Sequence, residues 1–410
     1  MKKLFPHFGA RGNMLIVLFS IMLFVFSFPL FAEDYGLLLN QNFGLGGTKD
    51  NLAVDYSAAL IPYFSTPFGD TMELYVSASA QVSYENNEWN FIPELLQTDF
   101  AWRSSDLSVR AGRMNYSDPL GFIASGLFDG AQVSHESGAG TFSAGAWYTG
   151  FIAKRSARIT MTAEDKSAYV KEFTYGDFIH TYFSSRRVLA ALEWEHSALA
   201  ELIRANVSVL GQFDFNGLTS SFHSQYIVGK IGMPFKSFDF NLGGTFEIAE
   251  VSTGDDLGIQ FAYVGEASVS WLLPTWMPDQ LSFVGRFASG GSGGDVIAFV
   301  PLTTKIQGDI LKADFSALSV FSLGYLARLH KTFSAALNTS LFLRTDLATF
   351  TQYPVVDGTG HFLGGEIFTR LYWSPLSDIR ITGGGGIFLP SSADAGIAWR
   401  VELGILAALY

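Results

Sequence analysis

The chain has 410 residues, a net charge of −12 and no cysteine. Its acidity makes nucleic acid a poor partner, because the phosphate backbone attracts basic surfaces. The lack of cysteine excludes disulfides, thiolate metal sites and lipid attachment through a cysteine. The hydrophobic content is 48%, yet beyond the N-terminal region no apolar run is long enough for a membrane-spanning helix. The apolar residues are therefore distributed along the chain and not gathered in blocks.

The first 32 residues have the pattern of a secretory signal peptide. Lys2, Lys3 and Arg11 precede the apolar run 14–28, and a cleavage site follows at Ala32. An uncleaved membrane anchor is the alternative, but the run is near the lower limit for a span. We therefore expect a signal peptide over residues 1–32 and one mature domain over residues 33–410.

Strict alternation of apolar and polar residues then begins and recurs along the chain. In residues 72–84, Leu74 and Val76 lie on one face and Glu73 and Ser77 on the other. The same alternation returns at 203–215, 238–248, 259–271 and 397–409. Sustained over so many strands, with charges on the polar face, this pattern is typical of a barrel with lipid outside and water inside.

The connections between these strands alternate in length, as they do in outer-membrane barrels. Short turns are expected at residues 103–106, 137–140, 196–199, 233–237, 274–279, 330–332 and 374–377. Longer connections are expected at residues 44–51, 115–126, 151–186, 249–257, 289–317, 346–361 and 389–395. With both termini in the periplasm, the count predicts an all-β fold: a closed antiparallel transmembrane β-barrel of about 18 strands, with 16 as the runner-up. This count requires residues 296–311 to lie in a loop.

Tryptophan placement supports this topology, because Trp prefers the interface between lipid and water. Four tryptophans on the predicted outer face precede short turns and indicate a periplasmic belt: Trp102, Trp194, Trp271 and Trp373. Three more are expected near the opposite rim: Trp89, Trp147 and Trp399.

The last strand resembles the C-terminal assembly signal of outer-membrane barrels. Glu402, Gly404, Ala407 and Leu409 follow its spacing, although Ala407 and Leu409 replace the usual aromatics and Tyr410 is one step out of phase. This resemblance implies the barrel-assembly machinery as a partner.

Two long connections raise the question of what occupies the lumen. Residues 151–186 and 289–317 could fold into the lumen and narrow it or stand outside as a binding surface. An external, solvated loop is the commoner case, whereas the channel hypothesis below uses inward loops as its size limit. The first of them is rich in basic residues, namely Lys154, Arg155, Arg158, Lys166 and Lys171.

Charged residues at polar-face positions are the candidate site. The arginines are Arg286, Arg328, Arg344, Arg370, Arg380 and Arg400. The acidic residues are Glu193, Glu195, Asp239, Glu247 and Glu266. Two opposed walls of this kind would create a transverse field that selects solutes. The alternative, which we favour slightly, is that the charges form structural pairs such as Glu366 with Arg370 or Glu402 with Arg400.

A short motif points to a family. Arg110-Ala-Gly-Arg113, followed by Gly126-Leu-Phe-Asp129-Gly-Ala131, resembles a strand pair of porin-like outer-membrane channels, including alginate-export-type and substrate-selective porins. The resemblance implies a lumen position for Arg113, although Val109 and Ala111 share its phase.

No catalytic pattern stands out. The histidines beyond the signal region, His135, His180, His196, His223, His330 and His361, show no metal-ligand spacing and no serine nucleophile motif. We therefore expect no enzyme activity, no metal and no cofactor.

The leading hypothesis is a passive channel in the bacterial outer membrane. Small polar or anionic solutes would diffuse through a charged, water-filled lumen, and the expected partners are membrane lipid and these solutes. One alternative is a surface adhesin or ligand receptor that uses long loops on a plugged barrel. Another is a transporter of hydrophobic substrates with a lateral opening, for which the glycines 383–386 could weaken one strand.

Overall fold

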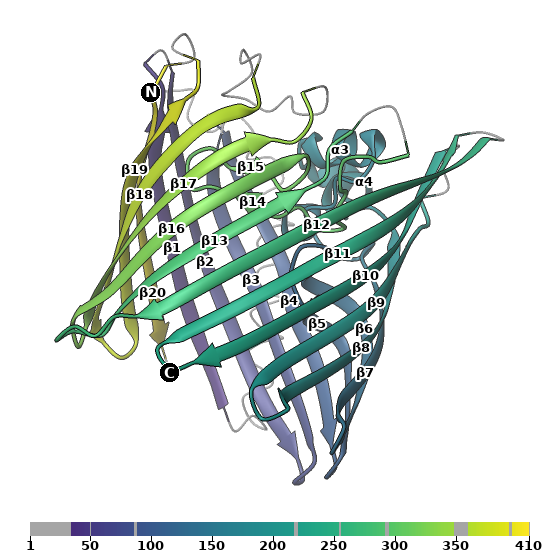
Figure 1. The fold of residues 1–410 in the computed structure, drawn as a ribbon. Coiled ribbons are helices and arrows are strands. Elements are labelled where there is room, and N and C mark those ends of the chain that lie inside the picture. The colour runs from purple at the N-terminus through teal and green to yellow at the C-terminus, as the bar shows by residue number, and fades with distance from the viewer. Residues whose placement is uncertain are drawn as a thin grey trace.

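The computed structural model describes residues 34–49, 51–85, 88–216, 220–253, 256–291, 295–347, 360–392 and 396–409. The expected signal peptide and Tyr410 of the assembly signal lie outside the described residues. Eighteen antiparallel strands form one closed barrel (Figure 1). Among the residues described, no helix has both the length and the apolar character needed to span a membrane.

The barrel strands are β1 (Asp34–Gly47), β2 (Leu52–Phe68), β3 (Met72–Glu85), β4 (Glu88–Arg103), β5 (Leu107–Ser117), β6 (Ser125–Ser137), β7 (Gly140–Tyr148), β8 (Arg187–Leu199), β9 (Ile203–Asp214), β10 (Ser220–Phe235), β11 (Phe238–Thr253), β12 (Asp256–Leu272), β13 (Asp279–Ala288), β16 (Leu318–His330), β17 (Phe333–Arg344), β18 (Phe362–Leu376), β19 (Ile379–Pro390) and β20 (Ala398–Leu409). Each strand pairs with its neighbour in sequence, and β1 pairs with β20 from Leu37 opposite Leu409 to Gly47 opposite Trp399. The predicted count of 18 strands is confirmed.

The remaining elements are short and lie in two of the long connections. Helices α2 (Lys154–Ala157), α3 (Ala163–Val170) and α4 (Phe178–Tyr182) and the 3-10 turn η2 (Tyr175–Asp177) lie between β7 and β8. The two-residue strands β14 (Ile306–Gln307) and β15 (Ala313–Asp314) pair only with each other, between β13 and β16. Residues 296–311 are therefore part of a loop, as the strand count requires.

The direction of the side chains follows the predicted alternation. Phe240 and Leu403 are 41% and 46% exposed on the outer face, whereas Glu402 bonds to Arg370 inside the barrel. Because successive side chains of a strand point to opposite faces, the direction of one side chain gives the direction of the others along a regular stretch of that strand. An apolar exterior on a closed barrel is the architecture of a protein that lies in a bilayer.

One tryptophan departs from the prediction. Trp147 is only 2% exposed, and its ring stacks on that of Tyr116 with 4.0 Å between the centroids. It lies opposite Leu189, which is fully buried, on the inner face of β7 and β8. Trp147 is thus a residue of the interior and not of the outer-rim belt, whereas Trp373 is 47% exposed on the outer face as expected.

Placing a charge on either face tests this assignment of sides. Leu242→Arg puts a charge on the outer face near the middle of β11 and is expected to cost about 2–4 kcal/mol of unfolding free energy in lipid. Ser268→Arg, on the inner face of the neighbouring β12, is the matched control and should cost less than about 1 kcal/mol, because its charge meets water. Denaturant unfolding in lipid vesicles measures both. Equal losses would contradict the assignment.

Candidate functional site

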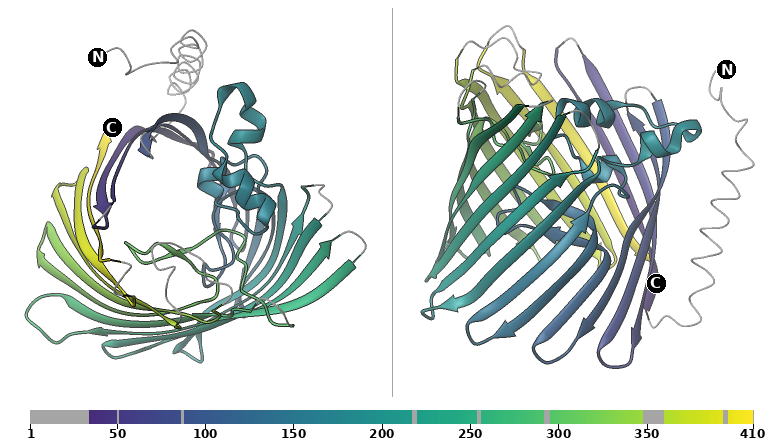
Figure 2. Two further views of the ribbon diagram at one scale, coloured as in Figure 1. Left: turned by 90° about the horizontal axis from the view of Figure 1, so that it is seen from above. Right: turned by 90° about the vertical axis from the view of Figure 1, so that its right-hand side faces the viewer.

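Three connections place residues inside the barrel, and we call them the inner segments. They are residues 118–124 between β5 and β6, residues 149–186 between β7 and β8, and residues 289–317 between β13 and β16. Figure 2 shows residues 289–317, in green, inside the ring of strands. The question that the sequence left open is thus answered: residues 295–317 enter the lumen, and residues 151–186 do so in part. Both carry apolar side chains, such as Ile159 and Phe315, that are buried inside the barrel.

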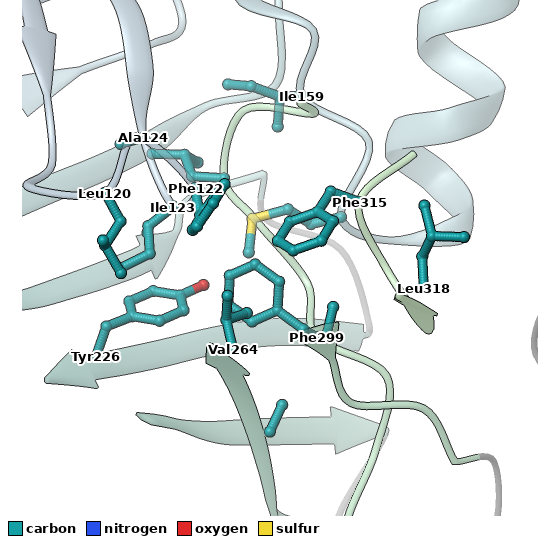
Figure 3. Close-up of a cluster of buried hydrophobic side chains, with 14 of the residues drawn as sticks. Leu120, Phe122, Ile123, Ala124, Ile159, Tyr226, Val264, Phe299, Phe315 and Leu318 are labelled. Carbon is teal, nitrogen blue, oxygen red and sulfur yellow. The ribbon is translucent and has the colours of Figure 1, made fainter. Parts of the chain in front are cut away.

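The inner segments build a hydrophobic core within the lumen (Figure 3). Phe122, Phe299 and Phe315 are fully buried, and the rings of Phe122 and Phe315 lie 4.7 Å apart. The barrel wall contributes inward-facing apolar residues to the same core, including Tyr226 and Val264. Burying each large apolar side chain contributes roughly 1.5–3 kcal/mol. The interior is thus apolar where the segments pack and not wet throughout.

Buried acids hold residues 289–317 to the wall. The carboxylate of Glu366 on β18 accepts the backbone N–H groups of Asp309, Ile310 and Leu311 at 2.7, 2.9 and 3.1 Å. On the opposite side, Glu247 of β11 accepts the backbone N–H of Val300 at 3.2 Å. Hydrogen bonds to a charged acceptor are worth about 1.5–3 kcal/mol each, so these contacts fix the path of the segment.

A buried ion triad holds residues 149–186 on the other side. Arg187, which is fully buried on β8, pairs with Asp165 at 2.6 Å and Asp214 at 3.2 Å. Asp165 also belongs to the capping box of α3, in which it exchanges hydrogen bonds with Thr162. The start of α3 is therefore anchored to β8 and β9.

The open space inside the barrel includes a cavity of about 1090 Å³, which we call the lumen cavity. It lies between the inner faces of β3 and β4, residues 153–158 and 169–173, α4, and residues 303–306. Its cationic lining residues are Lys154, Arg155, Arg158, Lys171 and Lys305. Its acidic lining residues are Glu85, Glu88, Glu94 and Glu172.

The cations of the lumen cavity differ in how far they are neutralised. Arg155 pairs weakly with Glu85 at 3.5 Å, and Lys171 pairs with Asp177 at 3.1 Å. Arg158 is exposed, and within the described part of the chain no salt bridge to its guanidinium is found. Lys305 lies 4.6 Å from the ring centroid of Phe122. Burial lowers the pKa of the Lys305 ammonium, and the nearby Arg286 lowers this pKa further.

The predicted arginines occupy three kinds of position. Arg286, Arg370 and Arg400 are ion-paired: Arg286 with Glu266 at 2.7 Å, Arg370 with Asp309 and with Glu402 at 3.1 Å, and Arg400 with Asp55 at 2.9 Å and Glu402 at 3.6 Å. Arg344 donates to the carbonyl of Gly360 at 2.7 Å. Arg328 and Arg380 line a recess near the short turns, together with Lys331. The structure therefore does not bring the six arginines together in one ring.

The predicted acids are likewise engaged. Glu193 accepts the hydroxyl of Tyr116 at 2.6 Å, and Asp239 pairs with Arg204 at 2.5 Å. Glu247, fully buried, accepts the hydroxyl of Ser224 at 2.9 Å. Glu195 lies opposite Thr141 on β7. For most of these residues, structural pairing is the visible role.

The structure also relocates two features of the sequence. The resemblance implied a lumen position for Arg113, but Arg113 lies within the wall between β4 and β6, where it forms a bidentate pair with Asp129 at 2.8 and 2.9 Å. The glycines 383–386 are paired on both sides, with β18 and with β20, so the wall is closed there. Sequence reasoning missed the cavity cations as a group, although the high number of basic residues in 151–186 was the available signal.

Comparisons with known proteins agree with this architecture. The fold is similar to that of Pseudomonas aeruginosa OccK2 (OpdF), solved in complex with glucuronate, with a TM-score of 0.62 and 11% identity over 92% of this chain and 99% of that chain. It is also similar to the outer membrane protein OpdK from the same organism, with a TM-score of 0.60 and 12% identity over 92% and 100% of the two chains. OpdK with vanillate gives a TM-score of 0.59 and 11% identity over 92% and 99%.

No family model and no curated protein matches the sequence. At such low identity the similarity to solved structures establishes the fold. The porin-like barrel that the short motif implied is thereby confirmed, and it is a fold of the bacterial outer membrane.

Proposed function

We propose that the protein is an outer-membrane channel through which small polar or anionic solutes diffuse. The observation that carries this proposal is the lumen cavity, which lies inside a closed barrel and is lined by five cations. Such a lining attracts anions, and the surrounding inner segments restrict the size of what passes. The structurally similar OccK2 and OpdK were solved with the carboxylates glucuronate and vanillate, which supports small organic anions as the solute class.

The adhesin alternative finds less support. Residues 295–317 pack inside the barrel and residues 151–186 do so in part, which leaves α2–α4 as the external surface of these two connections. We also propose, from the sequence patterns, that residues 1–32 direct export and that the C-terminal strand is presented to the barrel-assembly machinery.

Conductance of the purified protein in a planar bilayer tests the channel directly. We expect stepwise openings in potassium chloride and a reversal potential that indicates preference for chloride. Quadruple replacement of Lys154, Arg155, Arg158 and Lys171 by Gln should remove this preference, because the acids of the lumen cavity then dominate its field. A protein that inserts but never conducts would refute the channel.

The lowered pKa of Lys305 predicts a pH dependence. Lysine is charged below its pKa, so the preference for anions should weaken as pH rises, at a pH below the usual lysine range. Lys305→Gln should show the weakened preference for anions at every pH, and this preference should not decrease further as pH rises. Reversal potentials measured from pH 6 to 10 give the comparison. If the reversal potential of Lys305→Gln changed with pH as much as that of the unmodified protein, the titrating group would be another residue.

The anchor at Glu366 predicts the effect of loosening an inner segment. Glu366→Ala leaves three backbone N–H groups without their acceptor and should free residues 289–317 at a cost of several kcal/mol. Single-channel conductance should then rise by about twofold and become noisier, because the segment no longer holds one position. Ser322→Ala is the control, since the side chain of Ser322 bonds across the wall to Ser340 and, within the described ranges, to none of the inner segments. An unchanged conductance in Glu366→Ala would mean that this segment does not restrict the pore.

A further inference from the structure

One stretch of the barrel wall is not closed by strand pairing. Pairing between β4 and β5 stops at Thr98 and Arg113, although β4 continues to Glu88 and β5 to Ser117. From residue 97 back to residue 88, β4 pairs only with β3. From residue 114 to residue 117, β5 pairs only with β6. Gly112 has a φ of +115° where the strands part, a conformation that favours glycine. We call the unpaired stretch, β4 residues 88–97 against β5 residues 114–117, the wall split.

Side chains cap the free edge of β4 in the wall split. The carbonyl of Phe91 accepts the hydroxyl of Tyr175 at 3.0 Å, and the carbonyl of Pro93 accepts that of Tyr182 at 2.7 Å. The carbonyl of Leu95 accepts a guanidinium N–H of Arg113 at 2.6 Å. These alternate residues present their carbonyls to the same edge, and Pro93 has no N–H to leave unpaired there. Three side chains thus replace a strand.

An aromatic cluster fills the wall split. The rings of Phe173, Phe178, Tyr182 and Phe183 pack together, with 4.5 Å between the centroids of Phe178 and Tyr182. On the outside, Phe151 and Ile179 are 61% and 64% exposed, which suits contact with lipid. Figure 2 shows α2–α4, in teal, at one end of the barrel and reaching out beyond the ring of strands.

The wall split lies within reach of the bilayer. Trp102 and Trp89 of β4 mark the two interfaces, and the capped carbonyls of residues 91–95 lie between them along the strand. At roughly 3.3 Å per residue and a tilt near 40°, Leu95 lies about 15–18 Å above Trp102. Leu95 is itself 43% exposed on the outer face. The split therefore opens toward the outer leaflet.

The lumen cavity lies directly behind the split. Tyr182 both caps Pro93 and lines the lumen cavity, so one side chain connects the capped edge of β4 with the cavity. Phe173 lines the cavity beside Lys154 and Lys171, which places aromatic surface next to positive charge. A molecule with an apolar part and an anionic head matches both halves of this lining.

We infer that the wall split is a lateral portal, closed in this structure by residues 171–183, through which amphipathic anions pass between the outer leaflet and the lumen cavity, an inference that rests on the channel function proposed above. The closing stretch is held to β4 by side-chain hydrogen bonds to carbonyls and by no strand pairing. The buried Asp165–Arg187 pair lies on the N-terminal side of this stretch and keeps the start of α3 in place while it moves.

A cross-link that holds the portal shut tests the inference. The chain has no cysteine, so Phe91→Cys with Tyr175→Cys can be bridged by a short bismaleimide in the folded protein. Flux of octane-1-sulfonate into proteoliposomes should fall by about tenfold on bridging, while chloride conductance stays within about twofold. The control pair is Ser322→Cys with Ser340→Cys, whose hydroxyls lie 2.8 Å apart on another part of the wall. Bridging the control pair should change neither readout.

The outcomes separate the portal from the channel. Unchanged octane-1-sulfonate flux after bridging, or an equal fall in both readouts, would overturn the portal. Absence of chloride conductance before bridging would refute the proposed channel, and the sulfonate flux would still decide the portal.

A single substitution gives a second test with an intact fold. Tyr175→Phe removes one cap of the β4 edge and keeps the ring, so sulfonate flux should rise by about twofold or more at constant chloride conductance. Tyr263→Phe is the control, because Tyr263 is exposed on the outer face and stacks on Phe287 of the β12–β13 wall, away from the wall split. Equal flux in both variants would overturn the portal.

Discussion

A strand edge in a bilayer has no water with which to form hydrogen bonds, and this constraint governs the whole molecule. It requires β1 to meet β20, which closes eighteen strands into a ring. It also explains the chemistry at the wall split, where tyrosine hydroxyls and a guanidinium bond the carbonyls that a missing strand would have bonded. Three carbonyls of the β4 edge are thus bonded at the place where the barrel is not continuous in strands.

A barrel of this width would enclose a wide aqueous space, and the inner segments convert much of that space into packed protein. Their aromatic core around Phe122, Phe299 and Phe315 rests on inward apolar residues of the wall, such as Tyr226. Buried acids, especially Glu366, then bind the backbone of the segments. The polar groups of the wall serve largely as anchors, and the open cavity is left on the side of β3 and β4.

Charge is divided between wall and segments according to burial. Arg286, Arg370 and Arg400 on the wall are neutralised by carboxylates, since an unpaired charge among packed segments would be costly. Arg158 and Lys305 on the segments face the lumen cavity, where water can solvate them. The groups best placed to act on a solute are therefore those carried by the inner segments and not those spaced along the strands.

The sequence by itself determined the class of fold, the strand count and the two faces of the regularly alternating strands. The period-two alternation records a lipid side and an interior side at every residue, and this information is local to each strand. It also suggested the pairing of Arg400 with Glu402, two positions apart on one strand face.

Only the tertiary structure decided where residues 151–186 and 289–317 lie, that Trp147 faces inward, and that Arg113 bonds Asp129 within the wall. These features depend on contacts between residues far apart in the chain, such as Glu366 with Asp309 or Tyr182 with Pro93. Alternation cannot encode such contacts, because it gives the face on which a side chain lies and not what covers that face. The wall split followed from where two strands stop pairing, which is a property of the assembled sheet and not of either strand.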